Sequence, residues 1–242
     1  MRVVSVSGHS GSGKTTFIRQ LIPHLSRLGR VGTLKHTGHH SMELPDGKDT
    51  TVMFEAGAES VTGIDSGKLL ATFRRNTVTD ALDLLAAQGT EIAVIEGFKE
   101  SRLPRIVIGD LESEFCVLRN PAIEDVVRNL DRFPEYVTPD EMLLEIRREP
   151  DTSSLIPWYV TCRRDLGCDL TEESIADLNA RLREREESAA SRPGILAVRT
   201  AVHRGYLFGG TNGILIALAA EDGETGSLAL AEIVRGMGNS GK

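Results

Sequence analysis

The clearest candidates for chemistry in this sequence lie in one short segment near its start, Gly8-His9-Ser10-Gly11-Ser12-Gly13-Lys14-Thr15. The segment matches G-x-x-x-x-G-K-[ST] at every specified position, a pattern typical of phosphate-binding loops. Glycines let the backbone curl around an anion and direct successive N–H groups at its oxygens. The Lys14 ammonium group would contact the outer phosphates, the Thr15 hydroxyl would complete the shell of a Mg²⁺ ion, and Thr16 would add a phosphate contact. We therefore predict a site for a purine nucleoside triphosphate.

The elements on either side of this loop should position it. Arg2–Ser7 has the apolar pattern of a buried strand, and Arg30–Lys35 has that of a second strand. Between the loop and the second strand, apolar residues recur at helical spacing, namely Phe17, Ile18, Leu21, Ile22, Leu25 and Leu28. The alternative is a glycine-rich turn that matches the pattern by accident, and the flanking strand and helix argue against it.

An acidic side chain at the end of a neighbouring strand would orient the water shell of bound Mg²⁺. Glu96 has this position, because it follows the apolar segment Ile92–Ile95 and precedes Gly97. Its carboxylate should emerge at the carboxyl end of the strand, where open α/β sheets bind their ligands. Asp49, in the polar stretch Gly38–Thr50 that we predict to be a long loop, is a second candidate for the same role. A solvated loop position is the alternative for Glu96.

Lys35 and His36 end the second predicted strand and should face the same crevice as the phosphate loop. His39 and His40 follow closely, and such a group of histidines raises the question of a metal site. Adjacent ligands point in different directions, however, and no cysteine or acidic residue completes a tetrahedral set. The pattern therefore favours polar and proton-donating contacts with nucleotide or substrate over a zinc site. A solvated loop is the third interpretation.

Strand and helix patterns continue to alternate beyond this region. Thr77 can cap a helix that ends at Gly89, and two short strand patterns follow at Arg105–Ile108 and Phe115–Leu118. Such alternation predicts an α/β fold, a P-loop NTPase domain with a mainly parallel, twisted sheet covered by helices.

The composition of the chain changes after Pro150. Asp151–Pro157 has the character of a linker, and a charged helix and two further strand patterns come after it. We therefore predict two domains, a nucleotide-binding domain over residues 1–150 and a smaller α/β C-terminal extension over residues 151–242.

Composition narrows the classes of protein to consider. The formal net charge is −7, whereas general nucleic-acid binding depends on clustered lysine and arginine, so we expect no nucleic-acid partner. No apolar run approaches the roughly 20 residues that cross a bilayer, and no signal-peptide pattern follows Met1. We therefore expect a cytoplasmic protein without a membrane partner. Cys116, Cys162 and Cys168 fit neither a disulfide framework nor a metal-binding pair, and we interpret them as reduced thiols.

Several segments together carry a resemblance to a known family. In order along the chain they are the phosphate loop, Thr33-Leu34-Lys35-His36-Thr37-Gly38-His39-His40, Gly47-Lys48-Asp49-Thr50, Glu55-Ala56-Gly57-Ala58, Ile95-Glu96-Gly97-Phe98-Lys99 and Leu103-Pro104-Arg105-Ile106. Over about Met1–Arg119 the chain resembles the family of molybdopterin-guanine dinucleotide biosynthesis protein B (MobB). The Lys-His and Glu-Gly-Phe-Lys segments discriminate best, since many unrelated enzymes share the phosphate loop.

This resemblance implies a GTP-binding protein with weak, Mg²⁺-dependent GTPase activity. It would assist a partner guanylyltransferase in attaching a guanine nucleotide to molybdopterin, and members of the family look like homodimers. By the same resemblance, Gly8–Thr16 would hold the phosphates of GTP, Asp49 and Glu96 would serve the metal or the attacking water, and the crevice would be lined by Lys35, His36 and Lys99. The resemblance does not name the residues that select guanine.

The C-terminal extension carries a fainter likeness. Ala201–Leu207, Gly213–Ala219 and the closing helix are similar to the later part of the molybdopterin synthase large subunit. The early strand and the lysine-rich closing segment of that family are missing, which favours a structural or dimerising extension over a retained synthase activity. In that interpretation His203 is a packed residue and not a catalyst.

Two other functions fit the same phosphate loop. A small-molecule kinase would transfer the terminal phosphoryl group to a hydroxyl and would need a lid, for which Arg74, Arg75 and Arg102 are the candidates. No acceptor-binding signature accompanies them. A non-enzymatic, nucleotide-dependent adaptor would instead use the C-terminal extension to recruit partners, with hydrolysis incidental to its work.

Overall fold

The computed structural model describes residues 1–37, 42, 44–147, 158–163, 171–208 and 212–235. Its N-terminal unit contains a five-stranded sheet in the order β2-β5-β1-β6-β7. These strands are β1 (Arg2–Ser7), β2 (Val31–Lys35), β5 (Ile92–Glu96), β6 (Arg105–Val107) and β7 (Cys116–Arg119). Every neighbouring pair is parallel, which confirms the predicted α/β class.

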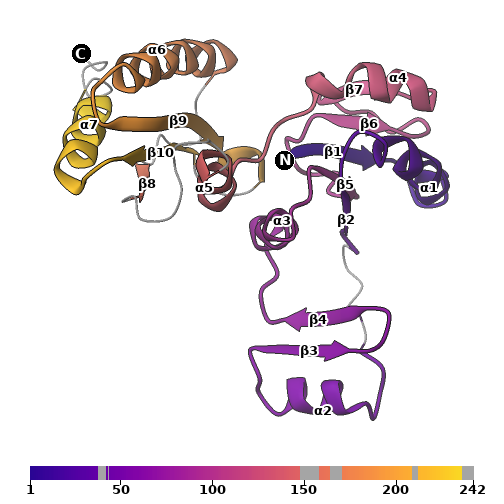
Figure 1. The fold of residues 1–242 in the computed structure, drawn as a ribbon. Coiled ribbons are helices and arrows are strands. Elements are labelled where there is room, and N and C mark those ends of the chain that lie inside the picture. The colour runs from indigo at the N-terminus through magenta and orange to yellow at the C-terminus, as the bar shows by residue number, and fades with distance from the viewer. Residues whose placement is uncertain (38–41, 43, 148–157, 164–170, 209–211, 236–242) are drawn as a thin grey trace.

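Helices cover both faces of this sheet (Figure 1). One face packs against α1 (Lys14–Leu25) and α4 (Ile123–Arg128), which a short 3₁₀ turn, η1 (Leu130–Arg132), follows. The other face packs against α3 (Val78–Ala87). Residues of β1 alternate between the two cores: Val4 and Val6 face α1, and Val3 faces the side of α3. Burial on both faces explains why these strands are almost continuously apolar in the sequence.

The predicted start of α3 at Thr77 is confirmed. The Thr77 hydroxyl accepts a hydrogen bond from the backbone N–H of Asp80 at 3.0 Å, and the Asp80 carboxylate accepts one from the backbone N–H of Thr77. This reciprocal capping satisfies two N–H groups that the first turn of a helix leaves without helical partners. The helix stops before Gly89, whose φ of 74° suits a residue without a side chain.

The segment of the chain between β2 and α3 forms a separate layer, which the sequence patterns do not predict. It consists of α2 (Asp49–Glu55) and an antiparallel hairpin of β3 (Ser60–Ile64) and β4 (Leu69–Phe73). We call it the hairpin layer, and Figure 1 shows it at one end of the N-terminal unit, apart from the main sheet. The end of the predicted loop over Gly38–Thr50 thus belongs to a helix, while residues 38–41 and 43 lie outside the described part of the chain.

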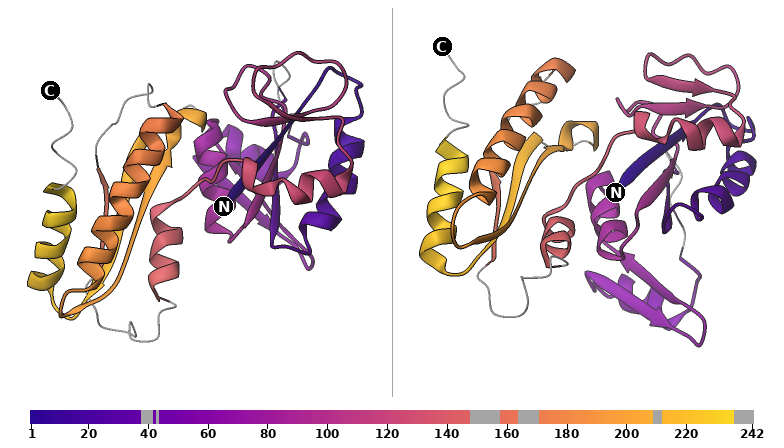
Figure 2. Two further views of the ribbon diagram at one scale, coloured as in Figure 1. Left: turned by 90° about the horizontal axis from the view of Figure 1, so that it is seen from above. Right: turned by 45° about the horizontal axis from the view of Figure 1, so that its top comes forward.

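The C-terminal unit contains a three-stranded antiparallel sheet in the order β8-β10-β9. Its strands are β8 (Trp158–Arg163), β9 (Ile195–Arg204) and β10 (Asn212–Ala220). Two helices, α6 (Glu172–Ala190) and α7 (Gly223–Arg235), cover one face, and α5 (Pro139–Arg147) covers the other (Figure 2). Alternate residues of β10 face the two cores: Ile214, Ile216 and Leu218 face α6 and α7, and Leu215, Ala217 and Ala219 face α5.

The packing of α5 bears on the domain boundary that we predict at residue 150. Met142 and Ile146 of this helix lie in one core with residues of β9 and β10, so α5 packs as part of the C-terminal unit although it precedes residue 150. The linker predicted at residues 151–157 lies outside the described part of the chain. The boundary at residue 150 stays a prediction.

The two units meet around Tyr136. Its ring packs at 5.0 Å from Phe208 and at 5.3 Å from His203, and its hydroxyl donates to Asp83 of α3 at 2.7 Å. His203 Nδ1 lies 3.0 Å from the carbonyl oxygen of Val137, in keeping with the packed role expected for it. Among the described residues, no helix combines the length and the apolar character needed to cross a membrane.

Candidate nucleotide-binding site

The phosphate loop joins the end of β1 to the start of α1. Gly11 and Gly13 have φ values of 75° and 90°, which side chains disfavour, and Gly13 is the residue before the first turn of α1. A Cβ atom at Gly8 would lie 2.3 Å from the carbonyl oxygen of Ile108, so a side chain does not fit there. The glycines of the motif are therefore required by the fold of the loop, and the loop presents backbone N–H groups beside the N-terminus of α1.

Two side chains of the loop have few protein partners for their polar atoms. Ser12 Oγ is buried and has no hydrogen-bond partner among the described residues. Lys14 Nζ donates to the carbonyl oxygen of His9, its own loop neighbour, at 2.6 Å. A buried hydroxyl without a partner is costly, so a ligand that supplies an acceptor oxygen suits this loop. The residues present thus fit a bound polyphosphate.

Several charged groups surround Lys14. Burial lowers the pKa of its ammonium group, the nearby Glu96 carboxylate raises that pKa in opposition, and the cations Lys99 and Lys35 lower it further. The structure therefore brings two of the predicted crevice residues, the cations Lys35 and Lys99, near Lys14 at the end of the phosphate loop. Their summed positive charge would attract an anion with several negative oxygens.

Glu96 lies where the sequence predicts it, at the carboxyl end of β5. In the sheet register it stands beside Val6 of β1 and Lys35 of β2. The Thr15 hydroxyl donates to its carboxylate oxygens at 3.2 and 3.3 Å, and Lys35 Nζ lies 3.5 Å from Glu96 Oε1. A hydroxyl and a carboxylate at this distance are the oxygen ligands that Mg²⁺ prefers, and the ion would replace the hydrogen bond between them.

The chain turns sharply directly after Glu96. Gly97 and Phe98 have φ values of 109° and 50°, and the Phe98 ring stacks on His36 with centroids 4.2 Å apart and an interplanar angle of 15°. The carbonyl oxygen of Gly97 also accepts a hydrogen bond from the Ser7 hydroxyl at 2.7 Å. This turn places Lys99 on the side of Lys14 and gives His36 an aromatic partner.

A family model described as molybdopterin guanine dinucleotide synthesis protein B (MobB) matches residues 3–127, which is more than half of the chain. The chain belongs to the MobB family. The matched part contains the phosphate loop, Glu96 and Lys99, and it ends before the C-terminal unit.

Two named relatives agree with the family match. The chain is 33% identical over 161 residues to the molybdopterin-guanine dinucleotide biosynthesis adapter protein of Haemophilus influenzae. The alignment covers 64% of this chain and 86% of that protein. It is 38% identical over 110 residues to a probable adapter protein of the same name from Bacillus subtilis. That alignment covers 44% of this chain and 64% of the Bacillus protein. The crystal structure of Bacillus subtilis MobB matches with 26% identity and a TM-score of 0.44 over 55% of this chain and 99% of that chain.

Arg105 is a residue of this MobB-family site that the sequence reasoning missed. It is fully buried in β6, and its guanidinium group donates to the backbone carbonyl oxygens of Leu103, Phe98, Lys99 and Ser101. These contacts fix the loop that carries Phe98 and Lys99. The signal was present in the sequence, because an arginine within an otherwise apolar strand pattern must find several acceptors inside the fold.

The remaining predicted residues are placed less centrally. His9 is exposed, with its Nε2 3.9 Å from the Asp110 carboxylate. Ser10 and Thr16 are exposed positions of the loop and of the first turn of α1. Arg74, a predicted lid residue, lies over the Phe54 ring and donates to backbone carbonyls of the hairpin layer, so it stabilises that layer.

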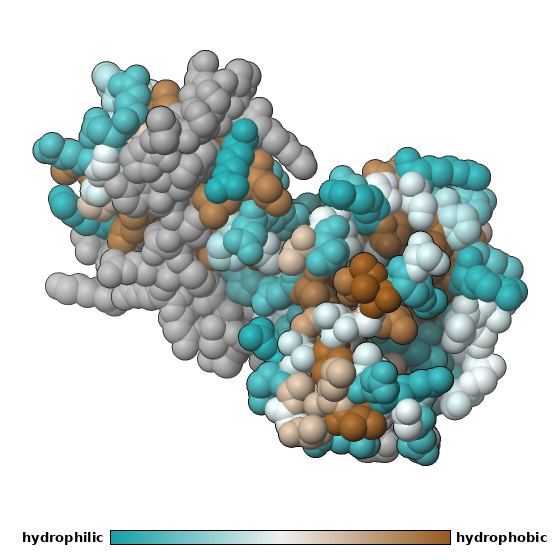
Figure 3. Space-filling view, turned by 60° about the horizontal axis from the view of Figure 1, so that its bottom comes forward, coloured by the Kyte–Doolittle hydropathy of each residue, from teal (hydrophilic) through white to brown (hydrophobic). Residues whose placement is uncertain are grey.

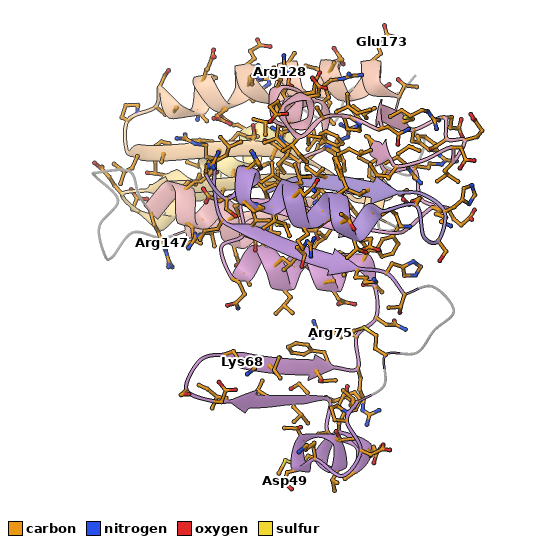
Figure 4. The ribbon with its side chains drawn as sticks, turned by 90° about the vertical axis from the view of Figure 1, so that its right-hand side faces the viewer. Asp49, Lys68, Arg75, Arg128, Arg147 and Glu173 are labelled. Atoms are coloured by element: carbon orange, nitrogen blue, oxygen red, sulfur yellow. The ribbon has the colours of Figure 1, made fainter. Side chains whose placement is uncertain are left out.

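The structure does not bring Asp49 together with Glu96 and Thr15. Asp49 is the first residue of α2, which packs on β3, and Figure 4 shows it at the far end of the hairpin layer. The prediction that placed it at the metal rested on a loop free to reach the crevice, whereas this residue begins a helix. Gly38, His39 and His40 lie outside the described residues. No group of three or more metal-binding side chains occurs within the described part of the chain.

Proposed function

We propose that this protein is a GTP-binding accessory protein of molybdenum cofactor biosynthesis, which assists a guanylyltransferase in forming molybdopterin guanine dinucleotide. The single observation that carries the proposal is the Thr15–Glu96 pair beside a complete phosphate loop in a chain of the MobB family. The names of the relatives, which describe adapter proteins of molybdopterin-guanine dinucleotide biosynthesis, support the pathway.

In this proposal the phosphate loop binds the phosphates of GTP, and Thr15 and Glu96 hold Mg²⁺. When bound, Mg²⁺ neutralises charge on the phosphate oxygens and polarises the terminal phosphoryl group. Lys14 contacts the outer phosphates, Lys35 keeps the Glu96 carboxylate in place, and Lys99 adds positive charge from the loop that Arg105 holds. These residues position GTP and neutralise the charge of its phosphates, which supports weak GTP hydrolysis and a delivery or switching role.

We also propose that the protein forms a homodimer through the hairpin layer. Ile64, Leu69 and Leu70 expose 83, 60 and 65% of their surface on an isolated two-stranded sheet. Figure 3 shows hydrophobic residues gathered on this side of the N-terminal unit, separated by polar ones. A lone hairpin is marginally stable in water, and large apolar side chains in contact with solvent favour association with a second copy.

The C-terminal unit is proposed to be an added structural module. Its own apolar core, between the β8-β10-β9 sheet and the helices α6 and α7, supports a separable unit, and it lies outside the segment that the family model matches.

Calorimetric titration of the purified protein with GTP and with ATP, each with Mg²⁺, tests the proposed nucleotide. We expect clear binding of GTP and weaker binding of ATP. Equal binding of both would remove the support for a guanine-specific role, and a preference for ATP would contradict the proposal.

A further inference from the structure

The loop after β6 lies against the phosphate loop, on the side away from Glu96. In the sheet, β5 and β6 are the two neighbours of β1, so Glu96 and this loop border the phosphate loop from opposite sides (Figure 1). The approach is close, because a Cβ atom at Gly109 would lie 3.3 Å from the Cβ atom of Ser12. His9 of the phosphate loop has its Nε2 atom 3.9 Å from the Asp110 carboxylate. The loop after β6 therefore forms one wall of the nucleotide crevice.

Two residues at the end of β7 hold the loop after β6 in one shape. The Asn120 side chain accepts a hydrogen bond from the Gly109 N–H at 2.7 Å and donates one to the Gly109 carbonyl oxygen at 3.2 Å. The Arg119 guanidinium group donates to the carbonyl oxygens of Gly109 and Leu111 at 3.3 and 3.0 Å. These contacts draw the loop across the end of β7. A loop supported in this way presents its side chains in fixed positions before a ligand binds.

We propose that this loop binds the base of the nucleotide and that the Asp110 carboxylate selects guanine. The inference rests on the proposed function for the identity of the nucleotide, and it adds the residue that distinguishes one base from another. An ionised carboxylate accepts hydrogen bonds and donates none. Guanine presents two donors side by side, its ring N1–H and its amino group, whereas adenine has an acceptor nitrogen in place of N1–H. Asp110 therefore favours GTP over ATP.

The position of the metal determines which end of the nucleotide reaches this loop. Mg²⁺ bridges the two outer phosphates of a bound triphosphate. Its proposed ligands, Thr15 and Glu96, lie on the β5 side of the phosphate loop. The inner phosphate, the ribose and the base then extend away from Glu96, toward β6 and β7. Two strand spacings, about 10 Å, separate β1 from β7, so the base reaches the loop that lies across the end of β7.

The Asp110 carboxylate is available for this role. Its side chain is 95% exposed, and the His9 nitrogen at 3.9 Å lies beyond hydrogen-bond distance, so that contact leaves the acceptor sites of the carboxylate open. A base stacked over the loop would remove the carboxylate from water and strengthen its hydrogen bonds to guanine. Glu112, two residues further along the same loop, instead lies beside a cation, with 4.0 Å between its Oε2 atom and Arg119 Nη2.

Base-modified nucleotides test the inference. Xanthosine triphosphate (XTP) has a carbonyl oxygen in place of the amino group of guanine, so it presents an acceptor to Asp110 and should bind less tightly than GTP. In Asp110→Asn the side-chain amide donates to that oxygen, and the side-chain carbonyl still accepts from N1–H. We expect the ratio of GTP affinity to XTP affinity to fall at least about 10-fold in this variant, the effect of one exchanged hydrogen bond.

The affinities are measured by displacement of a fluorescent, ribose-labelled GTP analogue from the full chain in the presence of Mg²⁺. Glu112→Gln is the matched control, because it removes one carboxylate from the same loop and should leave the ratio of GTP to XTP affinity unchanged. Asp110→Ala is a second test of the same residue. It should weaken GTP binding without improving XTP binding, because alanine neither accepts nor donates a side-chain hydrogen bond.

The outcomes separate this inference from the proposed function. An unchanged ratio of GTP to XTP affinity in Asp110→Asn would overturn the inference, and an equal loss of affinity for both would place the carboxylate at the metal or the phosphates. The proposed function would survive either result if the unmodified protein prefers GTP to ATP. Equal binding of GTP and ATP by the unmodified protein would contradict both.

Discussion

Thr15 and Glu96 meet because two neighbouring parallel strands end at the same edge of the sheet. Thr15 follows β1 through the phosphate loop, and Glu96 is the last residue of β5, with its side chain only 15% exposed. A carboxylate partly removed from water interacts strongly with a divalent cation, and removing its charge should therefore affect the metal more than the nucleotide.

Replacing Glu96 by glutamine isolates this contribution. In the unmodified protein Mg²⁺ should tighten GTP binding, and Glu96→Gln should lose about 10-fold of that gain while keeping its affinity for GTP in EDTA. Asp49→Asn removes one carboxylate in the hairpin layer and should leave both affinities unchanged. Calorimetry with and without Mg²⁺ measures the difference. A loss of the Mg²⁺ effect in Asp49→Asn would show that α2 moves to the metal.

At the scale of elements, the loop between β5 and β6 depends on one buried cation. Residues 98–103 form no helix or strand. Arg105 holds this segment by donating hydrogen bonds to four of the segment's backbone carbonyl oxygens. Removing a buried charged donor leaves those carbonyl oxygens without partners.

We expect Arg105→Met to lower the free energy of unfolding by about 3 kcal/mol, because several charge-assisted hydrogen bonds disappear together. Arg128→Met, which breaks an exposed ion pair with Asp125, should cost no more than about 0.5 kcal/mol. Urea unfolding followed by circular dichroism compares the two. Equal small effects would mean that the loop holds its shape without Arg105.

The hairpin layer is the second element with a distinct physical role. Leu70 is 65% exposed on β4, and Leu70→Asp should weaken the proposed dimer at least about 10-fold, since burying a carboxylate in an apolar interface is costly. The folded monomer should be unaffected. Leu28→Asp, at an equally apolar but distant exposed position after α1, is the matched control. Sedimentation velocity over a concentration series measures both, and an unchanged Leu70→Asp dimer would show that association uses another surface.

At the scale of the whole molecule, two units share a junction but have separate cores. Tyr136, Leu207 and Phe208 pack with the N-terminal core, and Thr79 donates to the carbonyl oxygen of Phe208 at 3.3 Å. The nucleotide site lies at the carboxyl edge of the main sheet and draws all its placed residues from the N-terminal unit.

Truncation separates these contributions. Chains ending at residue 137 and at residue 150 should both bind GTP as the full chain does. The longer fragment should expose more apolar surface, because Met142 and Ile146 of α5 lose their partners on the C-terminal sheet. Binding of a hydrophobic dye measures this difference. If both fragments bind the dye equally, α5 does not depend on the C-terminal sheet and the boundary at residue 150 gains support.

The sequence predicted those parts of the molecule whose structure depends on residues close together along the chain. The phosphate loop, the Thr77 cap of α3 and the position of Glu96 after an apolar strand follow from residue types at fixed spacing. The hairpin layer was missed because the exposed β4 lacks the alternation of a half-buried strand. The positions of Asp49 and Arg105 depend on contacts between segments that spacing along the chain does not encode.

The phosphate loop is the feature on which the proposed function depends most. Its central lysine should distinguish a triphosphate from a diphosphate, because the Lys14 ammonium group would contact the outermost phosphates. Calorimetric titration of the unmodified protein and of Lys14→Ala with GTP and with GDP, in the presence of Mg²⁺, measures this directly. We predict that Lys14→Ala weakens GTP binding about 10-fold more than GDP binding. Equal losses for the two nucleotides, or no nucleotide binding by the folded, unmodified protein at millimolar concentration, would contradict the account.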